Sequence, residues 1–264
     1  MNPPVTIDPL VVAEDLWSYT RPWPNQVLDD QGDLVLWNGS TSHRQDANVL
    51  RVRLDAASVE RRIDGARSWM GAHGRDTFTW YLGASATPAD LAARLRVRGA
   101  EPDPEDPVAF PMVLDHAPAA APGIEVLPVT DMEAWARCRE IVGECYHMPE
   151  ADRVAARTRL AEEWGYARAD GNRRFLARVD GEIVAYALLQ HLLVGPPSLG
   201  GAATLPAARG RGAFRALLCA CWEAATALGE PALVTLADAA GRPVLEHLGF
   251  LTGRPVEVLV DRSS

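Results

Sequence analysis

Short apolar runs alternate with longer amphipathic runs along most of the chain, and one segment with neither pattern divides it into two halves. That segment, residues 115–123, reads Asp-His-Ala-Pro-Ala-Ala-Ala-Pro-Gly and predicts an irregular linker. Short apolar runs beside turn residues predict strands, and apolar residues three or four positions apart predict helices. The chain is therefore predicted to fold as two tandem α/β domains, residues 1–117 and residues 118–264.

The first half has the weaker pattern of the two. Strands are predicted over residues 33–37, 48–54 and 77–82, and a helix over residues 59–73. Thr87-Pro88 predicts the start of another helix with Leu91 and Leu95 on one face, because proline fits the first helical turn.

The second half has more regular patterns. Strands are predicted over residues 124–128, 175–179, 183–189, 202–205, 233–236 and 256–260, and helices over residues 131–145, 152–164, 212–228 and 242–247. Asp180-Gly181 lies between two of these strands and predicts a tight hairpin. Both halves end in a leucine-containing helix, a glycine and an apolar strand, and the two endings lie about 150 residues apart, which favours a duplicated domain.

The composition excludes several classes of function. With 264 residues, 48% of them hydrophobic, the chain can form a sizeable core. The net charge of −9 and the pI near 5.2 argue against a general affinity for nucleic acid or an anionic membrane. All 26 basic residues are arginine, so Schiff-base chemistry, a lysine nucleophile and a Walker-type phosphate lysine are excluded.

Cysteine spacing and apolar run lengths predict the compartment. The four cysteines form no C-x-x-C pair and have no histidines at zinc spacing, so we expect reduced thiols and no metal. The first residues lack the basic and apolar regions of a signal peptide, and the longest apolar run, residues 183–194, is too short to span a bilayer. A soluble, cytoplasmic protein is expected.

Within residues 204–218, two arginines and two glycines alternate at residues 209–212, between a short apolar run and an amphipathic helix. The third glycine of a dinucleotide fingerprint is replaced by Arg215, and the absence of lysine excludes a P-loop. What remains is a strand, a short loop and a helix whose free N–H groups could bind an anion, with Arg209 and Arg211 adding charge. A solvated arginine-rich turn is the alternative from spacing alone.

The same stretch resembles motif A of the GNAT acetyltransferase superfamily, the Q/R-x-x-G-x-G/A loop that binds the pyrophosphate of coenzyme A. Residues 241–250, Gly-Arg-Pro-Val-Leu-Glu-His-Leu-Gly-Phe, are similar to motif B, and the hairpin at residues 175–189 matches the strand pair before motif A. The resemblance covers residues 124–260. The first half is similar to the degenerate first domain of tandem-GNAT proteins and has no Arg-Gly-x-Gly loop.

The resemblance implies a fold and a binding site. Each domain would be a mixed, mostly antiparallel sheet flanked by helices, with a splayed strand pair in the C-terminal domain. Asp238 would lie beside the thiol end of acetyl-coenzyme A, the acyl donor. The implied coenzyme A site comprises Ala203, Thr204 and Leu205, along the pantetheine arm, and Arg209, Gly210, Arg211, Gly212, Ala213, Phe214 and Arg215, around the pyrophosphate.

Three positions depart from the superfamily pattern. Phe214 stands where glycine or alanine is usual, and Asp238 replaces an asparagine. Leu245 occupies the position at which many members have a tyrosine that protonates the departing thiolate. Other candidates for this acid are Tyr146, Tyr166, Tyr186 and His191, and candidates for a general base are Glu144, Asp238 and the carboxyl group of Ser264.

The resemblance implies an N-acetyltransferase in which an amine attacks the thioester of acetyl-coenzyme A directly. The bulge-like Gly200-Gly201 entry would splay the strand, and its backbone N–H groups would polarise the thioester carbonyl. The acceptor is expected to be a small-molecule amine or a protein amino group, with no nucleic acid or membrane partner, and the chain a monomer or homodimer. A non-catalytic acyl-coenzyme A sensor and a thioester decarboxylase or hydrolase are the alternatives.

Overall fold

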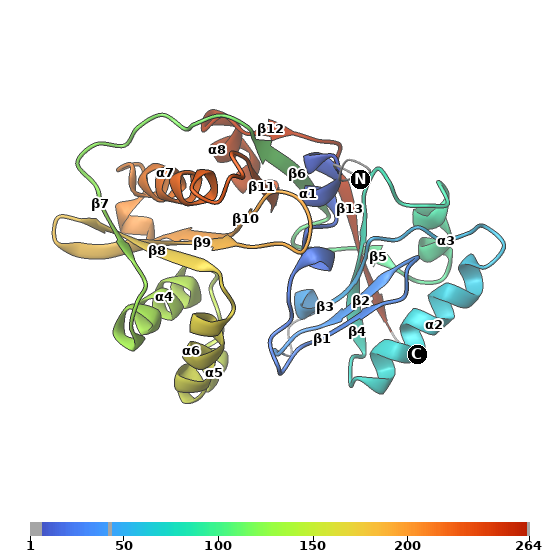
Figure 1. Cartoon of the computed structure of the whole chain (residues 1–264). Coiled ribbons are helices and arrows are strands. Elements are labelled where there is room, and N and C mark those ends of the chain that lie inside the picture. The colour runs from blue at the N-terminus through green and yellow to red at the C-terminus, as the bar shows by residue number, and fades with distance from the viewer. Residues whose placement is uncertain (1–6, 42–43, 263–264) are drawn as a thin grey trace, which may run out of the picture.

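The strands of the protein join into one long, mixed sheet. A computed structural model describes residues 7–41 and 44–262. Within these residues, 13 strands form a sheet whose order is β1-β2-β3-β4-β13-β6-β11-β10-β9-β8-β7, with β12 paired to β6 and β5 paired to β13. The predicted α/β class, with two tandem units of mixed sheet and flanking helices, is confirmed (Figure 1).

The first half contributes six strands and three α-helices. The strands are β1 (Val27–Asp30), β2 (Val35–Asn38), β3 (Ala47–Leu50), β4 (Thr77–Leu82), β5 (Glu101–Pro102) and β6 (Val108–Leu114). The helices are α1 (Pro9–Glu14), α2 (Val59–Ala72) and α3 (Leu91–Val97), with short 3-10 turns η1 (Leu16–Tyr19) and η2 (Arg44–Asp46).

The second half contributes the remaining described elements. The strands are β7 (Glu125–Pro128), β8 (Arg173–Val179), β9 (Glu182–Gln190), β10 (Ser198–Thr204), β11 (Leu233–Ala237), β12 (Leu251–Thr252) and β13 (Val256–Arg262). The helices are α4 (Met132–Cys145), α5 (Glu150–Thr158), α6 (Leu160–Ala169), α7 (Ala213–Thr226) and α8 (Gly241–His247), with the 3-10 turn η3 (Pro206–Ala208).

Most predicted elements are present, and three predictions were wrong in detail. The helix predicted over residues 152–164 is two helices, α5 and α6, which are separated at Arg159. The strand predicted over residues 48–54 ends at Leu50, because Arg51 has a φ of 47° and so leaves the extended region. Helix α3 begins at Leu91, three residues after Pro88, and α1, β1, β5 and β12 were not predicted.

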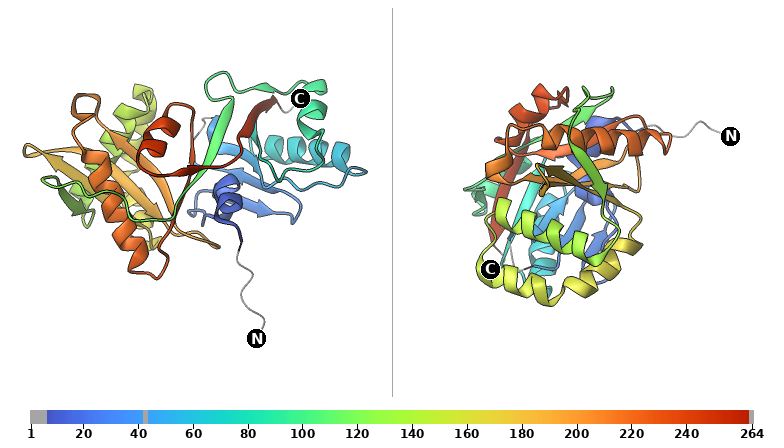
Figure 2. Two further views of the ribbon diagram at one scale, coloured as in Figure 1. Left: turned by 90° about the horizontal axis from the view of Figure 1, so that it is seen from above. Right: turned by 90° about the vertical axis from the view of Figure 1, so that its left-hand side faces the viewer.

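Helices cover the two faces of the second half of the sheet. On one face, α7 packs Leu217, Leu218 and Cys221 against strands β8 and β9. On the other face, α4 packs Trp135, Cys138 and other side chains into a separate core with β8, β9 and β10. Figure 2 shows α7 and the α4–α6 group on opposite sides of the strands. The loop before α7 and the end of α4 are thereby brought to β10.

Two strands cross between the halves of the chain. Strand β6, from the first half, pairs antiparallel with β11 from Leu114↔Leu233 to Phe110↔Ala237. Strand β13, at the end of the chain, pairs antiparallel with β4 of the first half, and Figure 1 shows it running into that half. Each half thus supplies a strand next to the other half's strands. The domain boundary at residue 117 stays a prediction.

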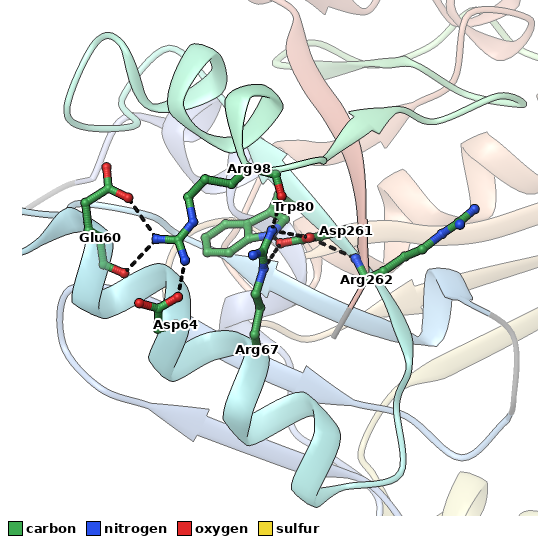
Figure 3. Close-up of polar contacts among 7 residues, drawn as sticks. All are labelled: Glu60, Asp64, Arg67, Trp80, Arg98, Asp261 and Arg262. Carbon is green, nitrogen blue, oxygen red and sulfur yellow. Dashed lines mark hydrogen bonds and ion pairs between the residues drawn. The ribbon is translucent and has the colours of Figure 1, made fainter. Parts of the chain in front are cut away.

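A buried carboxylate fixes β13 in the first half. Asp261 is 1% exposed and accepts hydrogen bonds from Trp80 Nε1 at 3.0 Å and from the Arg262 backbone N–H at 2.8 Å. Arg67 donates through Nε at 3.1 Å and through Nη2 at 2.8 Å, and also to the carbonyl of Arg98 at 2.8 Å (Figure 3). This ion pair, with its carboxylate buried and its guanidinium 16% exposed, holds β13 against α2.

Candidate functional site

The parallel strands β10 and β11 diverge almost as soon as they meet. Ser198↔Val234 is the one register pair between them in the described part of the chain. The Thr235 hydroxyl donates to the Leu199 carbonyl at 3.0 Å just beyond that pair. From there β10 continues along β9 and β11 continues along β6. The predicted splayed strand pair is confirmed.

A β-bulge marks the point of divergence. The register of β10 against β9 shifts between Leu199 and Gly201, so Gly200 has no partner on β9. A Cβ at Gly200 would lie 2.8 Å from Gln190 Oε1, whereas a Cβ at Gly201 would meet nothing within 4 Å. Only glycine fits the first position without displacing a neighbour. The bulge bends β10 away from β11.

The two edges of β10 can be assigned from its register. The Leu205 N–H donates to the Val184 carbonyl at 2.9 Å, so Leu205 turns its N–H to β9, and Ala203, which pairs with Tyr186, turns the same way. Main-chain groups alternate along a strand. Those of Ala202 and Thr204 therefore point away from β9, toward the side where β11 has diverged.

The loop after β10 leads into the N-terminus of α7. Gly210 and Gly212 have φ values of 74° and 87°, in the left-handed region that glycine adopts at little cost. Gly212 is the N-cap residue, and the first intrahelical bond runs from the Ala216 N–H to the Gly212 carbonyl at 3.0 Å. The N–H groups of the first turn, from Ala213 to Arg215, therefore have no acceptor within the helix.

This geometry suits an anion. The helix N-terminus has a partial positive charge, and a Cβ built at Gly210 meets nothing within 4 Å, so nothing crowds the loop there. Arg211 forms an ion pair with Asp180 in the β8–β9 turn, and Arg209 donates through Nε to the Thr204 carbonyl at 3.2 Å. The loop thus combines free amides, two glycines and two guanidinium groups beside β10.

Two of the departures from the superfamily pattern point into the core. Phe214 is partly buried and packs against the core on the α7 side of the sheet, away from the loop. Leu245 on α8 is 7% exposed and belongs to the same core. The position at which many superfamily members have their tyrosine acid is therefore surrounded by apolar side chains in this chain.

Two predicted catalytic residues are brought together at the divergence. The Tyr146 hydroxyl, at the end of α4, donates to the Ala202 carbonyl at 3.3 Å. The Tyr146 residue is 59% exposed, and desolvation by the groups around its hydroxyl raises the pKa of Tyr146. The negative charge of Asp238 raises the same pKa further, as does the nearby Cys145 thiol. The hydroxyl therefore stays protonated at neutral pH.

Asp238 has a structural partner of its own. The Asp238 side chain follows β11, is exposed, and accepts a hydrogen bond through Oδ1 from the Gly241 N–H at the start of α8. Its second carboxylate oxygen is not used in that bond. Glu144 is exposed on the last turn of α4, two residues from Tyr146.

The other acid and base candidates lie elsewhere. Tyr166 on α6 donates to Glu162 at 2.5 Å. Tyr186 is buried in the core beneath α4, and burial raises the pKa of Tyr186 strongly. The backbone N–H of His191 donates to the Asn172 side chain at 2.8 Å, at the far end of β9 from Ala185 and Thr204. Ser264 lies outside the described residues.

The corresponding strands of the first half do not open in this way. Beyond the parallel pairing of β3 and β4, the Thr87 N–H donates to the Val52 carbonyl at 3.2 Å, and the Leu54 N–H donates to the Thr87 carbonyl at 3.1 Å. The Thr87 hydroxyl adds a bond to the Leu54 carbonyl at 2.9 Å. The space that separates β10 from β11 is closed here by main-chain pairing.

Two features near the site were missed from the sequence. The Ala202 carbonyl, rather than a side chain, is the partner of Tyr146. Helix α1 and the turn η1 cover β6 and β11, where Val12 and Leu16 pack with Val234. The alternation of main-chain groups along the strand predicted over residues 202–205 could have identified the outward groups of β10, whereas no local pattern indicates that the first helix lies on β11.

The described residues, 7–41 and 44–262, give no group of three metal-ligating side chains. No helix within those same ranges has both the length and the apolar character needed to cross a bilayer.

Comparisons with known proteins agree with this geometry. The model of the acetyltransferase (GNAT) family matches residues 135–250, which include most of α4, the β8–β9 hairpin, the glycine loop and α8. No curated protein matched the chain.

Three solved structures have similar folds over most of the chain. A tandem GNAT protein from the clavulanic acid biosynthesis pathway is 19% identical, with a TM-score of 0.65, 95% of this chain covered and 88% of that one. A GCN5-related N-acetyltransferase from Kribbella flavida is 17% identical, with a TM-score of 0.67 and coverages of 97% and 96%. One from Sphaerobacter thermophilus is 19% identical, with a TM-score of 0.61 and coverages of 89% and 84%.

Proposed function

We propose that this chain, which belongs to the GNAT superfamily and has its tandem arrangement, transfers an acetyl group from acetyl-coenzyme A to an amine. One observation carries the proposal: the glycine loop at the start of α7 lies beside two strands that diverge after a single register pair. The loop offers amides to a diphosphate, and the outward edge of β10 offers hydrogen-bonding groups to an extended arm.

The residues that would bind the donor are those of the loop and of β10. In this proposal the N–H groups of the loop from Arg209 to Phe214 bind the pyrophosphate, with Arg215 at its edge. The Arg209 N–H donates to the Pro206 carbonyl at 3.3 Å, so it would have to exchange that bond for one to the phosphate. Thr204, between Ala203 and Leu205, offers its outward main-chain groups to the arm, and Ala202 does the same. In this proposal a main-chain N–H group at the Gly200-Gly201 bulge polarises the thioester carbonyl, because the register shift there interrupts the regular pairing of β10 with β9.

In this proposal, three side chains of the protein carry out the proton transfers. Tyr146 is the proton donor to the departing sulfur, since Leu245 is buried and Tyr146 is at the divergence. Asp238 and Glu144 are the carboxylates available to accept the proton of the attacking amine, and Asp238 lies within electrostatic reach of Tyr146. Orientation of the two reactants would supply much of the remaining rate enhancement.

The proposal extends to the class of acceptor. The excess of acidic residues, 35 against 26 basic, favours a cationic amine, either a small molecule or a protein amino group. A cytoplasmic location and a monomeric or homodimeric state stay predictions.

The decisive experiment measures thiol release from acetyl-coenzyme A with and without a panel of amines. We expect release that depends on an amine, together with acetylated product of matching amount. A chain that binds coenzyme A but releases no thiol with any amine would favour a non-catalytic sensor, for which the burial of Leu245 is the supporting observation. Thiol release without any amine would indicate a hydrolase or decarboxylase.

A further inference from the structure

Side chains already bond to the outward carbonyls of Ala202 and Thr204 on β10. Tyr146 donates from its hydroxyl to Ala202 at 3.3 Å, and Arg209 donates from Nε to Thr204 at 3.2 Å. These carbonyls are two residues apart, on the edge that β11 leaves. Tyr146 comes from the end of α4 and Arg209 from the loop before α7, so two separate elements meet on one strand edge.

An acyl-coenzyme A arm would need the same acceptors. The arm is an extended chain with two amide groups, and extended chains add to a free strand edge by main-chain hydrogen bonds. An arm amide that donates to the Ala202 carbonyl must displace the Tyr146 hydroxyl, or share the carbonyl with it. The displaced hydroxyl lies at the divergence, where Asp238 is close enough to affect its titration.

We propose that the Tyr146 hydroxyl is held on the Ala202 carbonyl until the arm of the acyl donor takes that carbonyl, and that this exchange frees the hydroxyl to protonate the departing sulfur. The inference rests on the proposed function. In it, binding of the arm is what makes the Tyr146 hydroxyl available as the acid. A donor bound only through its nucleotide leaves Tyr146 on β10.

Each bond and proton in the proposed transfer can be followed from reactants to products. The amine nitrogen forms a bond to the acyl carbon, and the carbon–sulfur bond breaks with its electron pair on sulfur. The Tyr146 hydroxyl gives its proton to that sulfur. The proton lost by the amine passes to a carboxylate or to solvent, and the tyrosinate takes up one proton before the next cycle.

The test compares Tyr146→Phe with wild type by calorimetry, using two ligands: coenzyme A, and adenosine 3′,5′-bisphosphate, which has no arm. Removing the hydroxyl removes the competing bond, so the Kd of coenzyme A should fall about three- to tenfold, the range given by one net hydrogen bond. The Kd of the bisphosphate should not change. With acetyl-coenzyme A and an amine, kcat should fall at least about tenfold.

Tyr166→Phe is the matched control, because its hydroxyl bonds only to Glu162 on the same helix among the described contacts, and it should change neither Kd nor kcat. Equal or weaker coenzyme A binding by Tyr146→Phe overturns the exchange, and so does an equal gain for the bisphosphate. Unchanged melting temperatures exclude a folding defect. Failure of wild type to bind coenzyme A would instead overturn the proposed function, and the inference with it.

Discussion

Arg67 on α2 and Asp261 on β13 form a two-point hydrogen-bonded ion pair across 194 residues of sequence. The pair joins the end of the chain to the first half, and Trp80 completes the coordination of the carboxylate from β4. Because β13 also pairs with β6, which pairs with β11, this contact supports the strand that carries the candidate site as well as the first half.

Asp261→Asn is expected to lower the free energy of unfolding by about 3 kcal/mol, because removing the buried carboxylate leaves the largely buried Arg67 without its counter-charge. Urea denaturation measures this. Glu257→Gln is the control on the same strand: its ion pair with Arg96 has both side chains partly exposed, so a loss within about 0.5 kcal/mol is expected. Equal losses in the two variants would contradict the assignment of a buried ion pair.

Gly212→Asp tests the anion site. The substitution places a carboxylate at the start of α7, where the nearest atom to a new Cβ is Ile124 Cγ1 at 4.0 Å, so space is sufficient and charge is the main change. Thermal stabilisation by coenzyme A should be abolished. Gly229→Asp is matched to it, since Gly229 follows the same helix with a φ of 82° and open space around it.

Both aspartates carry the cost of a left-handed residue, about 1 kcal/mol, so both variants should melt at similarly reduced temperatures. Gly229→Asp should keep the full stabilisation by coenzyme A. Stabilisation retained in Gly212→Asp would place the pyrophosphate elsewhere.

The parts of the fold that could be predicted depend on local rules. Asp180-Gly181 predicted the β8–β9 turn because both residues take positive φ, at 50° and 85°. Gly210 and Gly212 predicted a loop with close backbone approach for the same reason. The Gly200-Gly201 pair predicted the bulge that separates β10 from β11.

The missed parts depend on contacts between distant segments. Nothing within residues 108–114 or 256–262 indicates which half each strand joins, because both read as ordinary apolar strands. Tyr146 could be named as a candidate acid, but its bond to Ala202 depends on how α4 packs on the sheet. The six residues of α1 give too short a pattern to predict that they cover β11.

Asp15 is expected to make stability depend on pH. The residue is 4% exposed, and burial raises the pKa of Asp15 to about 6 although the nearby Arg53 charge opposes the shift. Between its usual value of 3.8 and 6, the folded state binds more protons than the unfolded state, so stability falls as pH rises through this window and is level above it.

The fall attributable to Asp15 should be on the order of 2–3 kcal/mol. Asp15→Asn lacks this titration, so the stability of wild type relative to the variant should decrease between pH 4 and pH 7, as measured by urea midpoints at both ends. Asp55→Asn, an exposed aspartate, should follow the wild-type profile. If the stabilities of wild type and Asp15→Asn change with pH in parallel, Asp15 is not the source of the pH dependence.

Leu245→Tyr tests whether the superfamily's usual acid could act from α8 in this chain. Leu245 packs into the core on the α7 side, so a tyrosine there overfills the core and buries a hydroxyl without a partner. We expect a loss of about 1–3 kcal/mol in the free energy of unfolding and no gain in kcat with acetyl-coenzyme A. Val244→Tyr, at a neighbouring residue that is 51% exposed, should change stability by no more than about 0.5 kcal/mol. A rise in kcat confined to Leu245→Tyr would show that position 245 reaches the reacting sulfur, and would remove the reason for assigning the acid to Tyr146.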